Sequence, residues 1–361
     1  MPCSCRGVRF IANEISNVTF SVMPTCSASF FKKDSRQAGM TTLKSYVNLL
    51  NAFVLVCSNR GKSKERYRMV TRGKDIINSH PCFSLEAHHK FGRIHLPVAP
   101  VCNIQCKYCV RKYDCANESR PGITSRILTP HEAMERVGTL LQRNENISVI
   151  GIAGPGEPLA NDSTFEVLRL IHREFPEIIL CVSTNGLLLP DRLDDLMKSG
   201  VRSVTITINA VMPEVAEKIY SWAYYKGKRY TGREAAELIV KNQARGLRNA
   251  IDAGLIVKVN SVLIPGVNDT EIPLIAWLAG TNGADLMNIM PLIPQAEFEF
   301  LQRPSREMIN RMREDCVKYI PQMTHCRQCR ADAFGILGED KDMELEILNA
   351  RIGEEYCDVV N

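Results

Sequence analysis

The sequence predicts an α/β fold in which six strand–helix units curve into a partial or complete barrel. From Gly92 onward, short runs rich in valine and isoleucine alternate with longer segments of helical periodicity. Strands that alternate with helices in this way form parallel sheets whose apolar side the helices cover. A second observation, the placement of polar residues along the strands, indicates that the barrel surrounds something other than a packed apolar interior.

Each of the six units can be located in the sequence. The expected strands are GRIHLPVAP, ISVIGIAG, IILCVSTNG, VRSVTITIN, GLIVKVNSVLIP and ADLMNIMPL, at residues 92–100, 147–154, 178–186, 201–209, 254–265 and 284–292. The expected helices cover residues 130–143, 163–173, 190–199, 231–253 and 270–280. No sequence repeat or low-complexity tract interrupts this order.

Polar residues share one parity of the expected strands and therefore point to one face of the sheet. The third strand carries Cys181, Ser183 and Asn185 on that face. The other polar residues of this set are His95, Thr205, Thr207, Asn209, Lys258 and Asn260. If the apolar parity meets the helices, the lumen is polar, whereas a packed barrel interior is usually filled by Val, Ile and Leu. A polar lumen is best explained by a group bound inside it.

Composition limits the class of protein. The chain has 361 residues, 45% of them hydrophobic, which is enough for a sizeable core. The formal net charge of +5 arises in the first 70 residues, where Lys and Arg far outnumber acids, so the rest is slightly acidic and nucleic-acid binding is not indicated. No apolar run approaches the roughly eighteen residues of a membrane span, and no secretory signal opens the chain. We therefore expect a cytoplasmic protein that binds neither membrane nor nucleic acid.

We expect three regions along the chain. Residues 1–75 form a basic, Ser-rich extension, residues 76–300 form the barrel core, and residues 301–361 form a C-terminal helix and a cysteine-pair segment that closes the barrel. The extension is interpreted as poorly ordered, as a start upstream of a true one near Met40 or Met69, or as an Arg- and Ser-rich targeting leader. We favour the first two, because the segment shows no sustained alternation of strands and helices.

Cysteines are concentrated after the first strand, in the stretch VAPVCNIQCKYCVRKYDC. Fourteen cysteines in a large chain without an export signal more often bind metal or do redox chemistry than form a disulfide scaffold. Cys102, Cys106 and Cys109 have the spacing C-x-x-x-C-x-x-C at the carboxyl end of a strand, where barrel enzymes build their sites. Three thiolates can hold three irons of a [4Fe–4S] cube and leave the fourth iron open to a small molecule. A zinc-binding loop is the alternative.

This spacing, with an aromatic residue before the last cysteine, resembles the signature of the radical S-adenosylmethionine (SAM) superfamily. The resemblance implies a partial (βα)6 TIM-like barrel of the radical SAM type with N- and C-terminal cluster-binding extensions. It also implies that the open iron chelates SAM and that one electron from the cluster cleaves it. Tyr108 would then lie near the adenine.

Two further stretches agree with the superfamily. AGPGEP, after the second strand, resembles its glycine-rich SAM-binding stretch, in which glycines permit close backbone approach and Glu157 can meet the SAM ammonium group. STNG ends the third strand with polar groups that suit the ribose or carboxylate of SAM. An ordinary turn is the alternative for both. The expected SAM-binding residues are Tyr108, Gly154, Gly156, Glu157, Ser183, Asn185 and Asn260.

The match extends to one family within the superfamily. HPCF, EAHHKFGRIHLPVAPVCNIQCKYC, RKYDCANESRPG, VNSVLIPGVND, NIMPLIPQAEF and HCRQCRADAFGILGED resemble the NifB family of nitrogenase cofactor maturases over about residues 78–340. The resemblance implies two further [4Fe–4S] clusters. It assigns Cys82, His95 and Cys181 to one of them, and Cys115, Cys326 and Cys329 to the other. Glu118 is a candidate for an additional oxygen ligand.

Each of these ligands has an alternative role when taken alone. A free thiol would explain Cys82, a small apolar core residue would explain Cys181, and a hydrogen-bonded core histidine would explain His95. The pair Cys326-x-x-Cys329 could form part of a zinc site or a redox dithiol, although a thioredoxin-like dithiol needs a βαβ beginning that is absent here. The joint occurrence of these residues favours cluster ligation.

The family resemblance also implies an activity. A radical SAM FeMo-cofactor maturase of lyase or transferase type would fuse the two further clusters and insert a carbide from a SAM methyl group, giving an eight-iron precursor of the nitrogenase cofactor. The implied catalytic residues are Cys102, Cys106, Cys109, Cys115 and Glu118. The implied partners are a reduced ferredoxin or flavodoxin-type electron donor and an iron–sulfur cluster donor. A separate carrier or scaffold protein is also expected, because we expect the chain to lack the carrier domain that some family members append.

The chain departs from the family pattern at Val110, where an asparagine is common. Two other functions remain open. One is a radical SAM maturase with auxiliary clusters that acts on a peptide, nucleotide or small molecule, and the other is a non-catalytic iron–sulfur carrier. The identity of the reaction product distinguishes the other kind of maturase from a nitrogenase cofactor maturase. Cleavage of SAM distinguishes an enzyme from a non-catalytic carrier.

Overall fold

A computed structural model of the chain describes residues 73–118, 124, 126–341 and 343. The chain divides into two compact units, Met1–Ser63 and Lys64–Asn361. The first unit lies wholly outside the described residues, and so do both alternative start sites. The three interpretations of the extension therefore stay predictions, and all the helices and strands named below belong to the second unit.

Seven strands form the main sheet, in the order β10-β1-β3-β4-β5-β8-β9. Their bounds are β1 Gly92–His95, β3 Ile147–Ile152, β4 Ile179–Thr184, β5 Val201–Thr207, β8 Ile256–Leu263, β9 Leu286–Pro291 and β10 Phe334–Ile336. All neighbours are parallel except β10, which is antiparallel to β1. β9 and β10 stand at the two edges, so the sheet is an open half-barrel, as predicted from the six strand–helix units.

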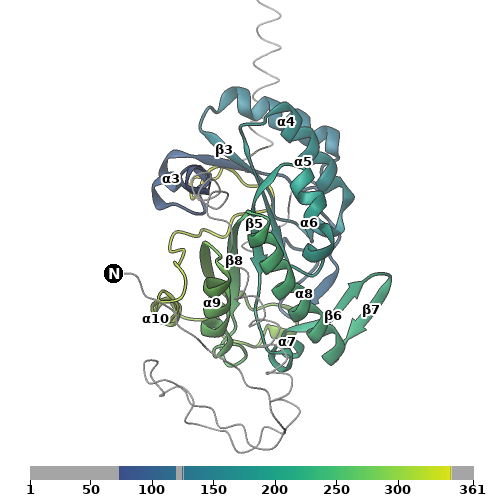
Figure 1. Cartoon of the computed structure of the whole chain (residues 1–361), viewed down its shortest axis with the longest axis vertical. Coiled ribbons are helices and arrows are strands. Elements are labelled where there is room, and N and C mark those ends of the chain that lie inside the picture. The colour runs from purple at the N-terminus through teal and green to yellow at the C-terminus, as the bar shows by residue number, and fades with distance from the viewer. Residues whose placement is uncertain (1–72, 119–123, 125, 342, 344–361) are drawn as a thin grey trace, which may run out of the picture. The chain divides into compact units, whose positions relative to one another are not determined.

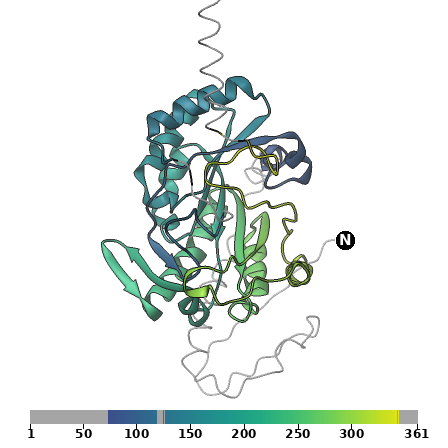
Figure 2. The same cartoon turned by 180° about the vertical axis from the view of Figure 1, so that it is seen from behind.

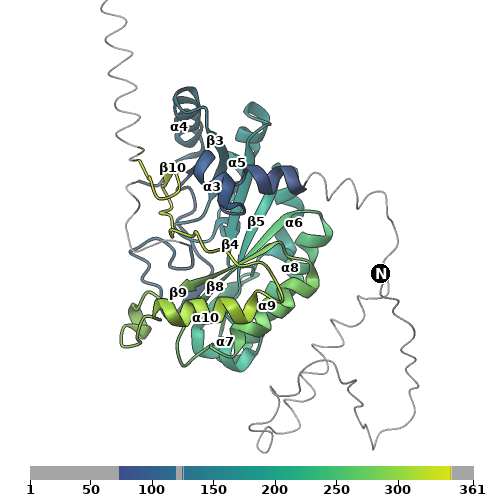
Figure 3. The same ribbon diagram turned by 90° about the vertical axis from the view of Figure 1, so that its left-hand side faces the viewer.

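Helices cover one side of this sheet (Figure 1). Their bounds are α4 Pro130–Arg143, α5 Asp162–Glu174, α6 Leu189–Lys198, α8 Gly232–Asp252 and α9 Glu271–Asn282, each within two residues of the predicted limits. α4 begins where Thr129 and Glu132 form a capping box with Pro130 at the first helical position. α10 (Arg306–Cys316) packs beside α9 (Figure 3).

The two faces of the strands differ as the parity argument predicted. Ile150, Leu180, Val204, Val257 and Ile289 face the helices and are 0% exposed. Burial of each such side chain stabilises the fold by about 1.5–3 kcal/mol relative to leaving it in water. The opposite parity carries cysteine, serine, threonine, lysine and asparagine, so the lumen of the half-barrel is polar.

The first strand is shorter than predicted. β1 ends at His95, whereas the sequence pattern suggested a strand to residue 100. Leu96 still donates its backbone N–H to the carbonyl of Gly151, but Pro97 has no N–H to continue the ladder. The chain therefore leaves the sheet early and begins the cysteine loop.

A second, three-stranded sheet was not predicted. It consists of β2 (Ile104–Cys106), β6 (Tyr220–Tyr225) and β7 (Lys228–Thr231). A short helix, α7 (Pro213–Ile219), directly precedes β6. β2 lies inside the cysteine loop and pairs antiparallel with β6. The loop is therefore anchored to a β-hairpin.

The C-terminal segment runs from β9, at one edge of the open sheet, to β1, which lies next to the other edge (Figure 2). Near its start, the backbone of Met287 in β9 exchanges hydrogen bonds with Pro321 and Met323. Near its end, His95 in β1 donates its backbone N–H to the carbonyl of Ala333 at 2.8 Å. The segment that contains Cys326 and Cys329 thus runs between β9 and β1, where both thiols can face the lumen. Among the described residues, no helix has the length and apolarity that crossing a lipid bilayer requires.

Candidate iron–sulfur and SAM site

Two adjoining cavities contain the predicted site residues. The first, which we call the loop cavity, has a volume of about 280 Å³ and is lined by Cys102, Cys106, Tyr108, Cys109, Cys115, Glu157 and Asn185, among others. The second, the lumen cavity, has about 50 Å³ and is lined by Cys82, His95, Cys181, Lys258, Asn260, Cys326 and Cys329, among others. Glu118, Ala153 and Ser183 line both, so the cavities share a wall.

The three cysteines of the predicted SAM-cluster loop line the loop cavity together. Gln105 holds the turn between them, because its side-chain amide donates to the backbone carbonyls of Cys106 at 3.0 Å and Cys109 at 2.8 Å. Burial raises the pKa of the Cys106 and Cys109 thiols, so these groups are neutral when no metal is bound. Binding of iron would displace their protons. Three thiol donors in one cavity fit the donor set of a [4Fe–4S] cluster with one open iron.

The described residues contain no group of three or more His, Cys, Asp or Glu side chains arranged to hold a single metal ion. The thiolates of a cubane cluster meet a different requirement, because each binds its own iron.

Tyr108 forms part of the wall of the loop cavity. Its side chain is buried, and its hydroxyl donates to Asn117 Oδ1 and accepts from Asn209 Nδ2 at 2.6 Å. The hydroxyl is therefore satisfied by the protein, which leaves the ring as the group that can contact a ligand. This placement is compatible with the predicted position near adenine.

The glycine-rich stretch packs against the strand end that leads into the cysteine loop. The backbone N–H groups of Gly156 and Glu157 donate to the carbonyls of Ala99 at 2.6 Å and Val101 at 2.8 Å. A Cβ at Gly156 would lie 2.5 Å from the Val101 carbonyl oxygen, so only glycine fits. The glycines were predicted to let the backbone approach SAM closely, but the close approach in the structure is to the backbone of Ala99 and Val101. Gly154 lines neither cavity.

Replacement of Gly156 by alanine is expected to lower the free energy of unfolding by about 1–3 kcal/mol, because the new methyl group overlaps backbone that cannot yield easily. Gly138, inside α4, is the matched control: nothing lies within 4 Å of a Cβ built there. Gly138→Ala should raise the free energy of unfolding by about 0.5–1 kcal/mol through helix propensity. Urea titration of both variants measures the difference, and equal effects would contradict the argument.

Glu157 is committed to hydrogen bonds from its own chain. Its carboxylate accepts from the backbone N–H of Leu159 at 3.1 Å and of Asn185 at 2.7 Å, and from the Thr184 hydroxyl at 2.5 Å. Burial raises its pKa to about 7, although these hydrogen bonds act in the opposite direction. Glu157 therefore joins the ends of the second and third predicted strands, and its carboxyl group also lines the loop cavity, where it was predicted to meet SAM.

The residues at the ends of the lumen strands divide between the cavities. Asn185 lines the loop cavity, where its Nδ2 donates to Asn103 Oδ1 at 2.7 Å and lies 3.9 Å from Cys102 Sγ. Ser183 lines both cavities, whereas Asn260, predicted to bind SAM, lines only the lumen cavity. Asn260 Nδ2 donates to Glu118 at 3.0 Å, so Asn260 positions a carboxylate in the shared wall.

Glu118 is the titratable side chain among the three residues that line both cavities. It accepts from the Thr207 hydroxyl at 3.2 Å as well as from Asn260. Burial raises the pKa of Glu118, while the positive charge of Lys258 lowers it. A carboxylate held in this way can reach a ligand in either cavity.

The lumen cavity gathers most of the residues assigned to the further clusters. Cys82, His95 and Cys181, which the family resemblance assigned to one cluster, lie there together. Cys326 and Cys329, assigned to the other, line the same cavity, whereas Cys115 lines the loop cavity. The division of these six residues between two clusters stays a prediction.

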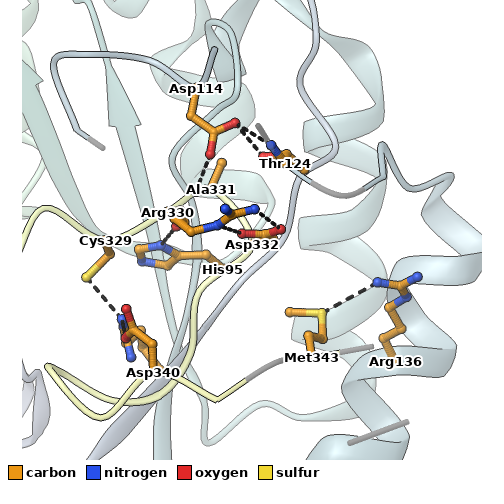
Figure 4. Close-up of polar contacts among 11 residues, drawn as sticks. His95, Asp114, Thr124, Arg136, Cys329, Arg330, Ala331, Asp332, Asp340 and Met343 are labelled. Carbon is orange, nitrogen blue, oxygen red and sulfur yellow. Dashed lines mark hydrogen bonds and ion pairs between the residues drawn. The ribbon is translucent and has the colours of Figure 1, made fainter. Parts of the chain in front are cut away.

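Asp114 connects Cys115 to the C-terminal cysteine pair. Its carboxylate accepts from the backbone N–H of Ala331 at 3.3 Å and from the hydroxyl of Thr124 at 2.5 Å (Figure 4). The segment after Cys109 and the segment after Cys329 are therefore held together, which keeps Cys115 near the shared wall.

His95 is poised as a neutral ligand. Its Nδ1 lies 3.0 Å from the Arg330 carbonyl oxygen, a contact in which Nδ1–H is the donor (Figure 4). Burial lowers its pKa to about 4, so Nε2 has a free electron pair at neutral pH. In metal-binding histidines, a hydrogen bond of this kind from the ring nitrogen that does not bind the metal fixes the tautomer. Gly151, its register partner, leaves room for the ring, because a Cβ there would lie 3.1 Å from His95 Cδ2.

Sequence reasoning did not single out His80, Arg93 and Asn288, which line the lumen cavity, and it placed Lys258 on the lumen side without assigning it a role. Arg93 is fully buried and donates to Cys329 Sγ at 3.1 Å, to the Gly335 carbonyl oxygen at 2.6 Å and to Asp340. Its parity, the same as that of His95, was the available signal. His80 accepts the backbone N–H of Cys82 at Nδ1, and its buried Nε2 has no hydrogen-bond partner among the described residues.

The lumen cavity is small for its donor set. A volume of about 50 Å³ holds only a few water molecules. Admission of a four-iron cluster would therefore require the thiols and Lys258 to move apart. The donor atoms of the lumen cavity therefore suit an iron–sulfur cluster, but the cavity would have to widen to admit one.

Comparison with known proteins decides the family. A profile of the radical SAM superfamily matches residues 96–278. The FeMo cofactor biosynthesis protein NifB of Methanocaldococcus infernus is 45% identical over 266 residues, which make up 73% of this chain and 87% of that protein. The chain belongs to the NifB family of radical SAM proteins.

Both resemblances read from the sequence are thereby confirmed, and membership of the radical SAM superfamily implies a [4Fe–4S] cluster and SAM. NifB of Klebsiella pneumoniae is 48% identical over 283 residues, covering 76% of this chain and 60% of that protein. This chain also spans 64% of NifB of Chlorobaculum tepidum, so it covers less than two thirds of these relatives. A weaker likeness in fold, with a TM-score of 0.48 at 13% identity, is to Streptococcus suis SuiB bound to S-adenosylmethionine, over 80% of this chain and 63% of that one.

Proposed function

We propose that this NifB-family chain makes the eight-iron precursor of the nitrogenase cofactor by fusing two [4Fe–4S] clusters and inserting a carbide derived from a SAM methyl group. One arrangement supports the proposal. The cavity that contains the three superfamily cysteines shares a wall with a cavity that contains four more thiols and a neutral histidine. Chemistry started at the first cavity could reach clusters held in the second.

The resident cluster at Cys102, Cys106 and Cys109 supplies, when bound, the electron that cleaves SAM. The chain's own residues place the reactants. Tyr108 and Asn185 form walls of the loop cavity, and the two substrate clusters would be held by the six assigned ligands, Cys82, His95, Cys115, Cys181, Cys326 and Cys329. Glu118, between the cavities, is proposed to contact a substrate cluster through its carboxylate. Such placement substitutes for a bimolecular encounter.

The proposed reaction needs partners of defined chemistry. A reduced ferredoxin or flavodoxin would supply electrons, a cluster donor would supply the two [4Fe–4S] substrates, and a carrier or scaffold protein would accept the product. The proposal places the reaction in the cytoplasm, the location expected from the sequence.

Anaerobic reconstitution with iron, sulfide, SAM and dithionite tests the proposal. The expected result is 5′-deoxyadenosine together with a product that activates cofactor-deficient nitrogenase. Cleavage of SAM without such a product would favour a radical SAM maturase that acts on another substrate. Absence of SAM cleavage by the fully loaded protein would favour a non-catalytic iron–sulfur carrier.

A further inference from the structure

The sheet formed by β2, β6 and β7 lies against the cysteine loop and has two different faces. Its inner face is apolar: Ile104 and Ala223, which are register partners, are at most 2% exposed. Its outer face begins with the register pair Gln105 and Trp222. Packing against the rest of the chain accounts for the residues of the inner face, but not for those of the outer face.

The outer face combines aromatic and guanidinium groups. Tyr224 and its register partner Arg229 lie on the same side as Trp222, and Tyr224 is 51% exposed. The Trp222 ring has the guanidinium carbons of Arg229 at 5.0 Å and Arg111 at 5.8 Å from its centroid. Both are within the range of a cation–π contact. We call the surface made by these residues and Gln105 the Trp222 face.

The positive charge of this face is not neutralised by carboxylates. No ion pair joins Arg111 or Arg229 to any described residue. Two carboxylates that contact the sheet are already matched, since Asp191 lies 3.4 Å from Lys226 and Glu297 lies 4.0 Å from Lys107.

The carboxylates lie at the margin of the sheet and contact its other residues. Asp191 accepts from the Tyr225 hydroxyl and Glu297 accepts from the Ser221 hydroxyl. The outer face is therefore cationic, although the chain beyond the first 70 residues is slightly acidic.

Direct contacts lead from this face to the cluster-binding cysteines. Arg111 Nε donates to Gln105 Oε1 at 3.0 Å, and the same guanidinium group donates to the Ile104 carbonyl oxygen. Gln105 in turn donates to the carbonyls of Cys106 and Cys109. The Trp222 face is thus the outer surface of the loop that would hold the resident cluster.

We propose that the Trp222 face is the docking surface of an acidic one-electron donor protein. One electron leaves the reduced centre of the donor and enters the group held by the loop cysteines, and no bond forms or breaks in that step. Uncompensated cations speed encounter with an acidic partner and make it salt-dependent. Arginine and aromatic side chains are also the groups that carry most of the energy of protein interfaces.

The proposal rests on membership of the radical SAM superfamily, which requires an electron donor, and not on the eight-iron product. A cationic aromatic surface also suits single-stranded nucleic acid. The contact with the cysteine loop favours the electron donor, and a nucleic acid is an outcome that the test includes.

The test uses charge reversal on the holoprotein. The variant Arg229→Glu changes the Trp222 face, and Arg173→Glu makes the same change at an exposed position of α5. The probe is a reduced flavodoxin or ferredoxin that supports SAM cleavage by the unaltered chain. Direct binding of the oxidised probe and donor-driven 5′-deoxyadenosine formation are measured at low and high salt, with dithionite-driven cleavage as reference.

The Trp222-face variant should bind the probe at least about tenfold more weakly at low salt, and the difference should shrink as salt screens the charges. The apparent KM for the probe should rise in parallel, while dithionite-driven cleavage stays unchanged. Unchanged binding, an equal loss in the α5 variant, or a proportional loss of dithionite-driven cleavage would overturn the proposal. The proposal would also be overturned if a single-stranded oligonucleotide bound the Trp222 face and did not displace the probe.

Discussion

The variant Cys102→Ala is expected to lose SAM cleavage, with the dithionite-driven rate of 5′-deoxyadenosine formation falling by at least about three orders of magnitude, since the hard chemistry belongs to the cofactor that this thiol holds. Cys102 lines the loop cavity together with the other two cysteines of the loop. Two thiolates cannot fix three irons, so the site that leaves one iron open for SAM would not form. Iron and sulfide analysis should show the loss of one cluster per chain.

Cys316→Ala is the matched control for this result. Cys316 is fully buried at the end of α10 and lines neither cavity. Its replacement should lower the free energy of unfolding, because a buried sulfur is removed, but should leave iron content and SAM cleavage unchanged. Retention of SAM cleavage by Cys102→Ala, or an equal loss in Cys316→Ala, would show that the loop cysteines do not hold the catalytic cluster.

The parallel half of the fold was predictable because its signals are local. Six runs of β-branched residues separated by helix-length segments define six strands, and the alternation of Cys181, Ser183 and Asn185 defines the lumen side. Neither inference needs to know which segments meet in space. For the same reason the parity argument placed His95 and Cys181 in one cavity.

The elements that were missed depend on distant partners. β2 has three residues and exists because β6, more than a hundred residues later, pairs with it. β10 is equally short and is defined by its pairing with β1. Runs this short carry no periodicity of their own, so local pattern could not reveal them.

The path of the chain that brings the C-terminal thiols to the lumen could not be predicted, for a related reason. Spacing identified Cys326 and Cys329 as a pair but could not show the path of the C-terminal segment. That path runs from β9 to β1, which puts the pair in the lumen cavity with Cys82. Arg93 was overlooked because an arginine in a buried strand has meaning only once its partners Cys329 and Asp340 are known.

Lys258 offers the clearest test of the lumen cavity as a site for anionic substrate clusters. Its side chain is buried in β8, and no hydrogen bond or ion pair joins its ammonium group to another described residue. Burial opposes its charge, whereas the negative charge that Cys82, Glu118 and neighbouring thiols carry when they are ionised attracts the ammonium group and raises its pKa. Burial also raises the pKa of Cys82 to about 12, so this thiol is neutral until metal binds. The ammonium charge is therefore balanced most fully when thiolate-bound clusters occupy the cavity.

The variant Lys258→Met is expected to retain the substrate clusters about 10–100-fold less well, as for other residues that support a metal site without binding the metal. The cluster at the loop cysteines and dithionite-driven SAM cleavage should be unaffected. The metal-free protein should unfold at the same or a higher urea concentration, because the cost of burying an unpaired charge is removed. Weaker retention of the substrate clusters together with unchanged or higher stability of the metal-free protein would show that Lys258 acts through its charge on the clusters and not through a general structural role.

Lys241→Met, on the exposed side of α8, is the control for the loss of one lysine. Iron and sulfide per chain are measured after challenge with a chelator, alongside urea unfolding of the metal-free proteins and formation of the eight-iron product. Lys241→Met should match the unaltered chain in all three. Two results would show that Lys258 is not the countercharge for the substrate clusters. One is full retention of iron by Lys258→Met under chelator, and the other is loss of stability together with loss of both kinds of cluster. The reason is that an anionic cluster must be held less tightly once the buried cation beside it is removed.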